Sequence, residues 1–164
     1  MSDKLDVVGI GNAMVDAIIP SNQSEIEKHE INRDSMNLID ENLKNNLHES
    51  YSIREMAGGG SLGNSMFGIT SFGGNGSFIG KIKNDEVGIF LQKDMVREGL
   101  QFPLGFTSPD ISTGCCTIFV EEDGTRTMCT FLGAGTLIGP DDINDQHIKN
   151  HKIAYLEGYL WDNE

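Results

Sequence analysis

The feature that most constrains the fold of this chain is an alternation of short apolar runs with longer amphipathic segments. Residues 6–11 form an apolar run closed by glycine, and residues 77–82 form a second one, as buried strands do. Apolar side chains recur at helical spacing over residues 62–69, between the two runs, and again over residues 87–95. Helices that separate buried strands are typical of βαβ units, so the sequence predicts an α/β fold with a mainly parallel sheet and helices on its faces.

Local signals predict the remaining elements. In chain order they are a short helix from Ser24, whose spacing to Glu27 is that of a capping box, a brief strand over residues 35–39, a helix capped by Asp40, a hairpin of residues 117–120 and 126–131, a helix opened by Pro140 and a buried strand over residues 152–158. A core strand followed by a short loop is an unusual end for such a sheet, so we expect this chain to be the N-terminal part of a longer protein.

The charge and cysteine content exclude several classes of protein. The 164 residues hold 12 Lys and Arg against 25 Asp and Glu, a formal net charge of -13, which argues against nucleic acid or an anionic membrane as partner. No apolar run approaches the roughly 20 residues that span a bilayer, and the start lacks the layout of a signal peptide. Three cysteines, two of them adjacent, make no disulfide framework. These features predict a soluble, reduced, cytoplasmic protein.

The sequence matches two nucleotide-binding motifs only in part, and we reject both. The dinucleotide fingerprint begins with Gly9 and Gly11, yet Met14 stands where the motif needs a third small residue for close helix packing. A P-loop around Lys81 fails as well, because Asn75 replaces the upstream glycine and neither Ser nor Thr follows the lysine.

Three groups of reactive or charged residues have plain structural interpretations. His147 and His151 stand four apart on a predicted helix, and without a third ligand we expect a solvated helix face and no metal site. Cys115 and Cys116 lie on a predicted strand and point to opposite faces, so we expect both to pack in the core. The acidic run over residues 121–123 is expected to be solvated at a hairpin tip.

One carboxylate resists such an interpretation. Asp16 follows the first predicted strand and is flanked by apolar residues, where a charge is costly unless it is solvated, paired or bound to a ligand with hydroxyl groups. Asn12, four residues earlier, offers a donor and an acceptor, and the two together suit neighbouring hydroxyls of a sugar. A turn stabilised by Asx side chains is the alternative.

The second unexplained feature is a glycine-rich segment. Residues 58–61, Gly-Gly-Gly-Ser, form a predicted loop that opens the helix carrying Asn64. Glycines let a backbone approach a ligand closely, and a helix N-terminus presents unpaired N–H groups. A polar pocket is therefore one interpretation, and a plain flexible loop is the other.

Taken in order, these residues resemble the N-terminal half of the ribokinase-like (PfkB) carbohydrate and nucleoside kinases, most of all the adenosine kinase-like branch. Residues 9–16 resemble the first strand of that family, residues 59–64 its di-glycine substrate motif, and residues 78–88 the strand-turn-helix of its N-terminal signature. Residues 155–162 are also similar to bacterial members. The resemblance covers nearly the whole chain.

The fold implied by the resemblance is a three-layer α/β core with a small β lid over the sugar site. Residues 1–164 would form the N-terminal part of one such domain, with lid segments near residues 13–20, 34–40 and 110–132. The C-terminal ATP-binding part of the family is expected to lie outside this chain. A homodimer through the lid or an exposed sheet edge is a further expectation.

The resemblance also implies which residues bind the substrate. They are Asn12, Asp16, Gly59, Gly60 and Asn64, with Asp16 accepting the sugar hydroxyls. Arg126, on the second strand of the hairpin, would approach the transferred phosphate. No residue of this chain is expected to ligate a metal.

The activity implied is transfer of the γ-phosphoryl group of ATP, with Mg²⁺, to a primary hydroxyl of a sugar or nucleoside such as adenosine or a ribose-like compound. The family takes its catalytic base from a C-terminal Gly-Ala-Gly-Asp-type segment, whereas the nearest string here, residues 133–136, ends in Thr136. We therefore expect no catalytic residue in this chain, which would be the substrate-binding half and inactive alone. A non-catalytic sugar-binding or interaction module that lost the kinase half is the alternative.

Overall fold

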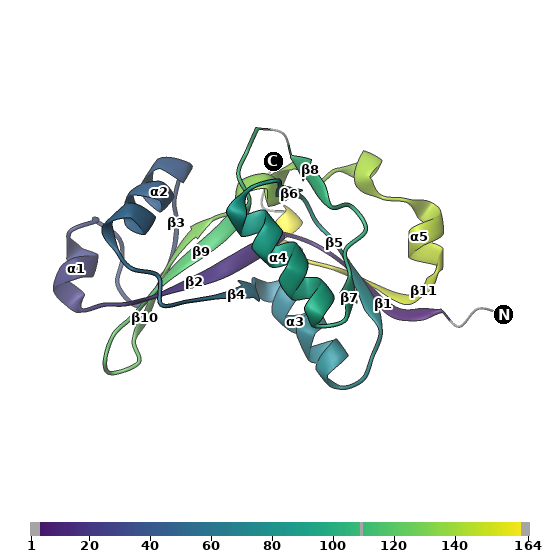
Figure 1. Cartoon of the computed structure of the whole chain (residues 1–164), viewed down its shortest axis with the longest axis horizontal. Helices are drawn as coiled ribbons and strands as arrows, with labels where there is room; N and C mark the ends of the chain where they lie inside the picture. The colour runs from purple at the N-terminus through teal and green to yellow at the C-terminus, as the bar shows by residue number, and fades with distance from the viewer. Residues whose placement is uncertain (1–3, 109, 162–164) are drawn as a thin grey trace.

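Two β-sheets organise the chain in the computed structural model, which describes residues 4–108 and 110–161 (Figure 1). The core sheet is wholly parallel and has the order β11 (His151–Leu156), β1 (Leu5–Ile10), β5 (Gly76–Ile79) and β7 (Leu100–Gln101). The outer sheet has the order β3 (Met36–Leu38), β10 (Arg126–Phe131), β9 (Gly114–Val120), β2 (Met14–Pro20) and β4 (Glu55–Gly59). A short pair, β6 (Ile82–Lys83) and β8 (Phe106–Ser108), stands apart from both.

Helices cover both sheets. They are α1 (Gln23–Glu27), α2 (Glu41–Ser50), α3 (Ser61–Ser71), α4 (Glu86–Arg97) and α5 (Asp145–Lys149), with 3₁₀ turns at Gly133–Leu137, Pro140–Asp142 and Gly158–Trp161. No helix of the described ranges is long and apolar enough to cross a membrane. Residues 155–162, which are similar to bacterial family members, and the end of the chain extend past residue 161, so their last residues lie outside the described part of the chain.

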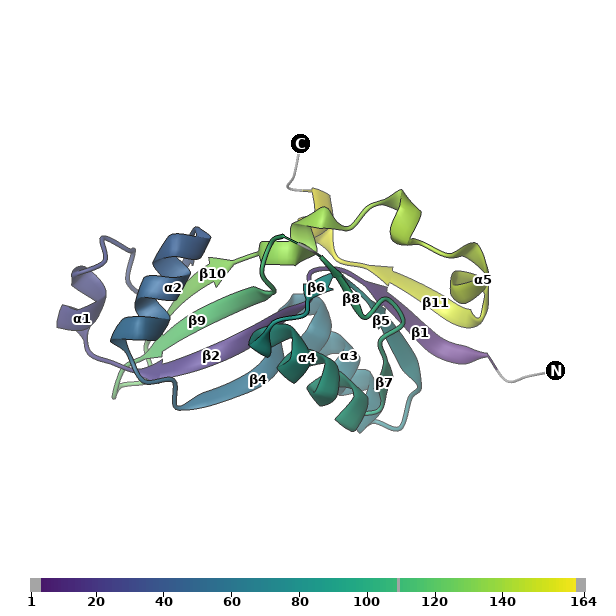
Figure 2. The ribbon, with the colours of Figure 1, turned by 45° about the horizontal axis from the view of Figure 1, so that its top comes forward.

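The core sheet lies between two helical layers, as Figure 2 shows, with α3 and α4 on one face and α5 on the other. Neighbouring residues of β1 point to opposite faces: Val7 packs with Phe78 against α3 and α4, whereas Val8 packs with Ile79 and Ile148 of α5. This alternation builds two apolar cores from one strand, and the predicted three-layer α/β architecture is confirmed.

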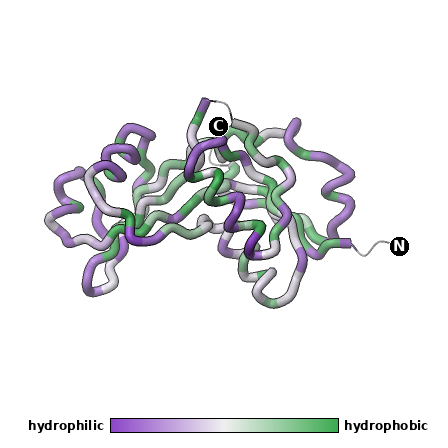
Figure 3. Tube along the Cα trace, in the orientation of Figure 1, coloured by the Kyte–Doolittle hydropathy of each residue, from purple (hydrophilic) through white to green (hydrophobic). Residues whose placement is uncertain are grey.

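The outer sheet has one covered face and one open face. On the covered face Ile19 and Phe119 pack against Ile26 of α1 and Leu47 of α2, two helices made mostly of hydrophilic residues (Figure 3). The opposite face carries a second apolar cluster that includes Met14. All three segments expected in a lid fall in this sheet, and β4 joins it as a strand that was not expected.

Four element predictions need correction. The glycine-rich loop is the end of strand β4, and the predicted strand over residues 77–82 breaks at Gly80 into β5 and β6. The short helix α1 is capped by Asn22, not by Ser24. Pro140 opens only a 3₁₀ turn, and the helix α5 follows it.

The predicted strand near the C-terminus exists as β11, but most of it is not buried. After His151 every residue of β11 is exposed, including Ile153 at 59% and Leu156 at 46%. Apolar composition indicated burial, whereas β11 forms the edge of the core sheet, so that in the described structure only β1 pairs with it.

Candidate functional site

The order of the core sheet identifies where a ligand is expected. From β1 the chain adds β5 and β7 on one side and β11 on the other, so the strand order reverses between β1 and β11. Open parallel sheets bind ligands beyond the carboxyl ends of their strands at such a reversal. Asn12 follows β1 there and Glu157 follows β11, with the N–H of Glu157 bonded to the carbonyl of Ile10 at 3.0 Å.

Glu157 organises this end of the sheet. Its Oε2 accepts the backbone N–H of Asn12 at 2.7 Å and the side-chain Nδ2 at 2.9 Å, and its Oε1 accepts the N–H of Leu62 at 3.1 Å. Leu62 lies in the first turn of α3, where the helix dipole favours a negative charge. The carboxylate is only 4% exposed, and these three donors stabilise it in that position.

Sequence reasoning missed Glu157 as a site residue, although it is a carboxylate near the end of a predicted buried strand. The same network changes the account of Asn12, whose amide nitrogen is directed to Glu157. The amide oxygen of Asn12 is buried without a hydrogen-bond partner among the described residues, and it faces Gly135. The expected role of Asn12 toward a sugar hydroxyl therefore stays a prediction.

Asp16 lies on the open face of the outer sheet, in a strand and not in an Asx-stabilised turn. Its partners across the sheet are Ala57 of β4 and Cys116 of β9, so the carboxylate shares a face with these two side chains. A Cβ on Gly59 would collide with the carboxylate, which therefore needs glycine at that position. Burial raises the pKa of Asp16 above its ordinary value, opposed by a hydrogen bond from the N–H of Gly60 and by the charge of Arg126.

The first half of the glycine-rich segment forms the end of strand β4 because β2 supplies its partner. Gly59 pairs with Met14 and Gly58 pairs with Val15 in the antiparallel ladder. Gly60 then turns the chain into α3 with φ +78°, a conformation that favours glycine. The interpretation of this segment as a plain flexible loop is therefore wrong.

Asn64 and Arg126 complete the set of expected site residues. Asn64 is exposed in the first turn of α3, and its N–H bonds to the carbonyl of Gly60 at 3.0 Å. Arg126 begins β10 and is exposed; it pairs with Val120 of β9. The structure thus brings Asp16, Gly59 and Gly60 together, sets Asn64 one turn further on, and leaves Arg126 in electrostatic reach of Asp16.

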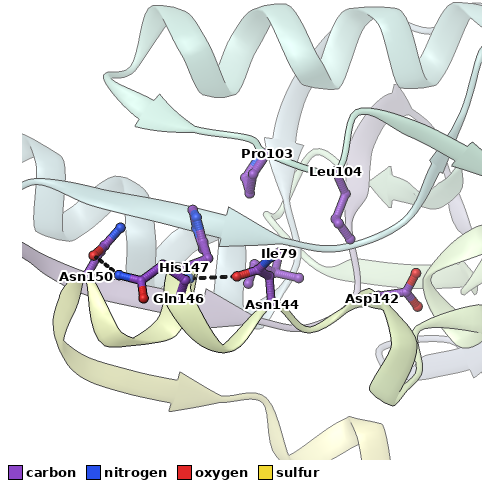
Figure 4. A pocket seen from close by; sticks show the side chains of 8 residues that line it. All are labelled: Ile79, Pro103, Leu104, Asp142, Asn144, Gln146, His147 and Asn150. Carbon is purple, nitrogen blue, oxygen red and sulfur yellow. Dashed lines mark hydrogen bonds between the residues drawn. The ribbon is translucent and has the colours of Figure 1, made fainter.

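A separate cavity of about 480 Å³ lies on the α5 side of the core sheet (Figure 4). Its lining residues are Ile79, Pro103, Leu104, Asp142, Asn144, Gln146, His147 and Asn150. It contains none of the expected substrate-binding residues.

The prediction that His147 and His151 share a solvated helix face is wrong. The helix α5 ends before His151, which folds back as the buried first residue of β11. The Nε2 atoms of both histidines contact the hydroxyl of Ser77, at 2.9 and 2.8 Å, and His151 Nδ1 contacts the carbonyl of His147 at 2.8 Å. Burial lowers the pKa of His147, and the neighbouring His151 lowers it further.

The predictions for the cysteines and for the acidic run have different outcomes. Core packing of Cys115 and Cys116 is confirmed, because both are buried and on opposite faces of β9. Solvation does not account for all of the acidic run, since Glu121 bonds to Arg33 at 2.7 Å.

Comparison with known proteins identifies the family. Residues 5–163 match the family described as pfkB family carbohydrate kinase. This chain belongs to that family. The resemblance inferred from the sequence motifs is confirmed.

Solved structures of relatives support the assignment for this pfkB-family chain. An adenosine kinase from Sinorhizobium meliloti is 37% identical with a TM-score of 0.87, over 98% of this chain and 49% of that one. A probable sugar kinase from Rhizobium etli CFN 42 is 33% identical with a TM-score of 0.87, over 99% of this chain and 49% of that one. An uncharacterized sugar kinase of Archaeoglobus fulgidus is 28% identical over 96 residues, or 58% of this chain and 38% of that protein. The chain thus spans about half the length of the two solved relatives, the adenosine kinase and the probable sugar kinase.

Proposed function

We propose that this pfkB-family chain carries the acceptor-substrate site of an ATP-dependent kinase that phosphorylates the primary hydroxyl of a sugar or nucleoside, adenosine or a ribose-like compound. The observation that carries the proposal is the position of Asp16, half-buried on the open face of the outer sheet and in contact with Gly59 and Gly60. The names of its relatives, an adenosine kinase and sugar kinases, support the same substrate class.

The chemistry of Asp16 suits two adjacent hydroxyl groups. An ionised carboxylate accepts several hydrogen bonds, and the N–H of Gly60 supplies one of them. Burial disfavours this charge, so hydroxyl donors from a bound sugar would stabilise it. We propose that Gly59 leaves space for the carboxylate and that Asn64 and Asn12 line the same site.

Exposed apolar side chains at the edge of the same sheet face favour a nucleoside over a free sugar. Cys116 shares a row of paired residues with Asp16, and this row continues through Thr130 to Leu38, which is 65% exposed. Met36, on the same edge strand, is 51% exposed. An aromatic base resting on these side chains would remove apolar area from water, and flexible sulfur-containing side chains adapt to flat rings. The outer sheet would then act as a lid over the nucleoside.

The donor side of the reaction receives no residue assignment beyond Arg126. The described residues contain no group of three His, Cys, Asp or Glu side chains suited to a metal ion, so Mg²⁺ is assigned to no set of residues in this chain. We propose ATP as the phosphoryl donor, with Arg126 near the transferred group and the kinase acting in the cytoplasm.

We propose that the groups that carry out the chemical step also lie outside the acceptor site around Asp16. Thr136 lies in a 3₁₀ turn and bonds to the carbonyl of Gly133 at 2.9 Å, so it is not assigned as a base. In this proposal Asp16 binds and orients the acceptor, and the chain alone transfers no phosphate. Positioning of the acceptor hydroxyl is itself a large part of catalysis in phosphoryl transfer.

Calorimetric titration of the chain with adenosine, ribose and fructose tests the proposal. We expect saturable binding of adenosine that weakens at least ~10-fold, about 1.4 kcal/mol, in Asp16→Ala, while Asp123→Ala, at the exposed hairpin tip, leaves it unchanged. Binding without phosphate transfer, even when a complete family member's C-terminal half is supplied, would favour a non-catalytic binding module. Unchanged affinity in Asp16→Ala would contradict the site.

A further inference from the structure

Helix α4 belongs to the layers of the core sheet, yet one of its buried side chains reaches the outer sheet. Asp94 is 5% exposed, and its Oδ2 accepts the backbone N–H of Gly58 in β4 at 2.8 Å. The other carboxylate oxygen pairs with Arg97, whose side chain is 69% exposed. Asp94 therefore joins α4 to the outer sheet through a buried hydrogen bond.

The contact replaces a missing neighbour strand. Within the described structure β4 is an edge of the outer sheet, and Gly58 pairs with Val15 of β2 on its inner side. A backbone N–H on the outer side of an edge strand needs an acceptor if it is buried, and Asp94 supplies one. A Cβ on Gly58 would lie 2.7 Å from the ring of Phe67 and 2.9 Å from Asp94 Oδ2. The strand thus runs in a narrow slot between α3 and α4.

A second carboxylate of the same helix fastens the strand on the other side of β2. Asp85 caps α4, and its two oxygens accept the hydroxyl of Thr113 at 2.8 Å and the N–H of Thr113 at 2.9 Å. Thr113 immediately precedes β9. Because β2 lies between β9 and β4, the strand that carries Asp16 has a neighbour attached to α4 on each side.

The position of β4 decides the geometry around Asp16. Gly59 and Gly60 directly follow Gly58, and they provide the surface against which the Asp16 carboxylate packs and the N–H that bonds to it. A shift of β4 away from α4 would move Gly59 and Gly60 together relative to the Asp16 carboxylate. Catalytic and binding groups lose much of their effect when such supports move by about 1 Å.

We propose that Asp94 is a positioning residue for the acceptor site: its hydrogen bond to Gly58 holds β4 against α4 and so fixes Gly59 and Gly60 beneath Asp16. The inference rests on the proposed function for the part that concerns the substrate. The contact that it assigns to Asp94 is independent of the ligand.

Three variants separate the acceptor role of Asp94 from its charge. Asp94→Asn keeps an oxygen that can accept the N–H of Gly58, Asp94→Leu keeps the branching at Cγ without any acceptor, and Arg97→Gln removes the surface ion pairs of Arg97 with Asp94 and Glu98. Amide hydrogen exchange over residues 55–60 and adenosine affinity are measured for each. In Asp94→Leu we expect exchange at Gly58 to rise at least ~10-fold, which corresponds to about 1.4 kcal/mol, and affinity to fall several-fold. Asp94→Asn and Arg97→Gln should stay within about twofold of the parent.

Each outcome has a defined meaning. Parent-like exchange in Asp94→Leu, or a loss in Asp94→Asn as large as in Asp94→Leu, would overturn the proposal. If Asp94→Leu does not fold, Asp94→Asn decides, because the proposal requires it to retain both Gly58 protection and affinity. If the parent chain binds neither adenosine nor ribose, the proposed function fails, and the exchange measurement alone judges the role of Asp94.

Discussion

Asn12 and Glu157 are 145 positions apart in the chain and are joined by two hydrogen bonds to one carboxylate oxygen, at 2.7 and 2.9 Å. The pair ties the start of the crossover into the outer sheet to the end of β11, and Leu62 ties α3 to the same carboxylate. Three elements that meet at the reversal of strand order are thus held by a single buried side chain.

Removal of Glu157 is expected to destabilise the fold. Glu157→Ala leaves three buried N–H donors without their acceptor, and each such group costs about 1–3 kcal/mol. We expect urea unfolding to show a loss of at least ~2 kcal/mol in the free energy of unfolding. Glu122→Ala, at an exposed position, is the matched control. Equal stability of the two variants would show that this network does not hold the site together.

Neutralising Asp16 is expected to stabilise the protein at neutral pH while it removes ligand binding. The pKa of Asp16 is raised by burial, so the folded state holds a proton more tightly than the unfolded state. Stability then falls as the pH rises from the unfolded value of 3.8 through the folded pKa, and the ionised group is disfavoured at pH 7. Thermal melts should show a higher Tm for Asp16→Asn than for the parent at pH 7. A lower Tm would contradict the assignment of burial as the dominant influence.

His147 of α5 is expected to make the fold sensitive to acid. The pKa of His147 is lowered from 6.5 by burial and by His151, so the unfolded state binds a proton at a higher pH than the folded state. Stability that is complete above pH 6.5 should therefore decline as the pH falls below that value. Urea midpoints at pH 7.5 and 5.5 check this. His147→Gln, which keeps a donor toward Ser77, should show a smaller decline, and an equal decline would place the acid sensitivity elsewhere.

The three cysteines are expected to be unreactive in the folded protein. Burial raises the pKa of Cys115 to about 12, of Cys116 to about 11 and of Cys129 to about 12, so little thiolate exists near neutral pH. Labelling with a thiol reagent at pH 8 should be slow and should become fast in urea. Rapid labelling of the native chain would mean that β9 and β10 open readily.

Much of the fold could be predicted because local signals and tertiary packing agree. Asp40 caps the helix expected of it, the helix expected over residues 87–95 forms with Asp85 as its cap, and the hairpin of β9 and β10 forms where it was predicted. Strand β4 was missed because glycine and alanine have low strand propensity, and only its pairing with β2 overcomes that preference. No local signal records such a partner.

The site was predicted in part for a similar reason. Asp16 was recognisable as a carboxylate among apolar residues, and Gly60 as a residue suited to a helix entry. Glu157 is also a carboxylate near apolar residues, but its structural role depends on the N–H donors of Asn12 and Leu62, which are far away in the sequence. Distant partners of this kind, like the contact between Asp94 and Gly58, follow from the topology and cannot be read from spacing.

The most direct test of the acceptor site is a nuclear magnetic resonance titration of the isotope-labelled chain with adenosine. The account predicts saturable shifts at the amides of Asp16, Gly59, Gly60 and Asn64, with Asn144 and Gln146 beside the α5 cavity unchanged. Shifts confined to the α5 cavity, or none at the four site amides at saturating ligand, would contradict it.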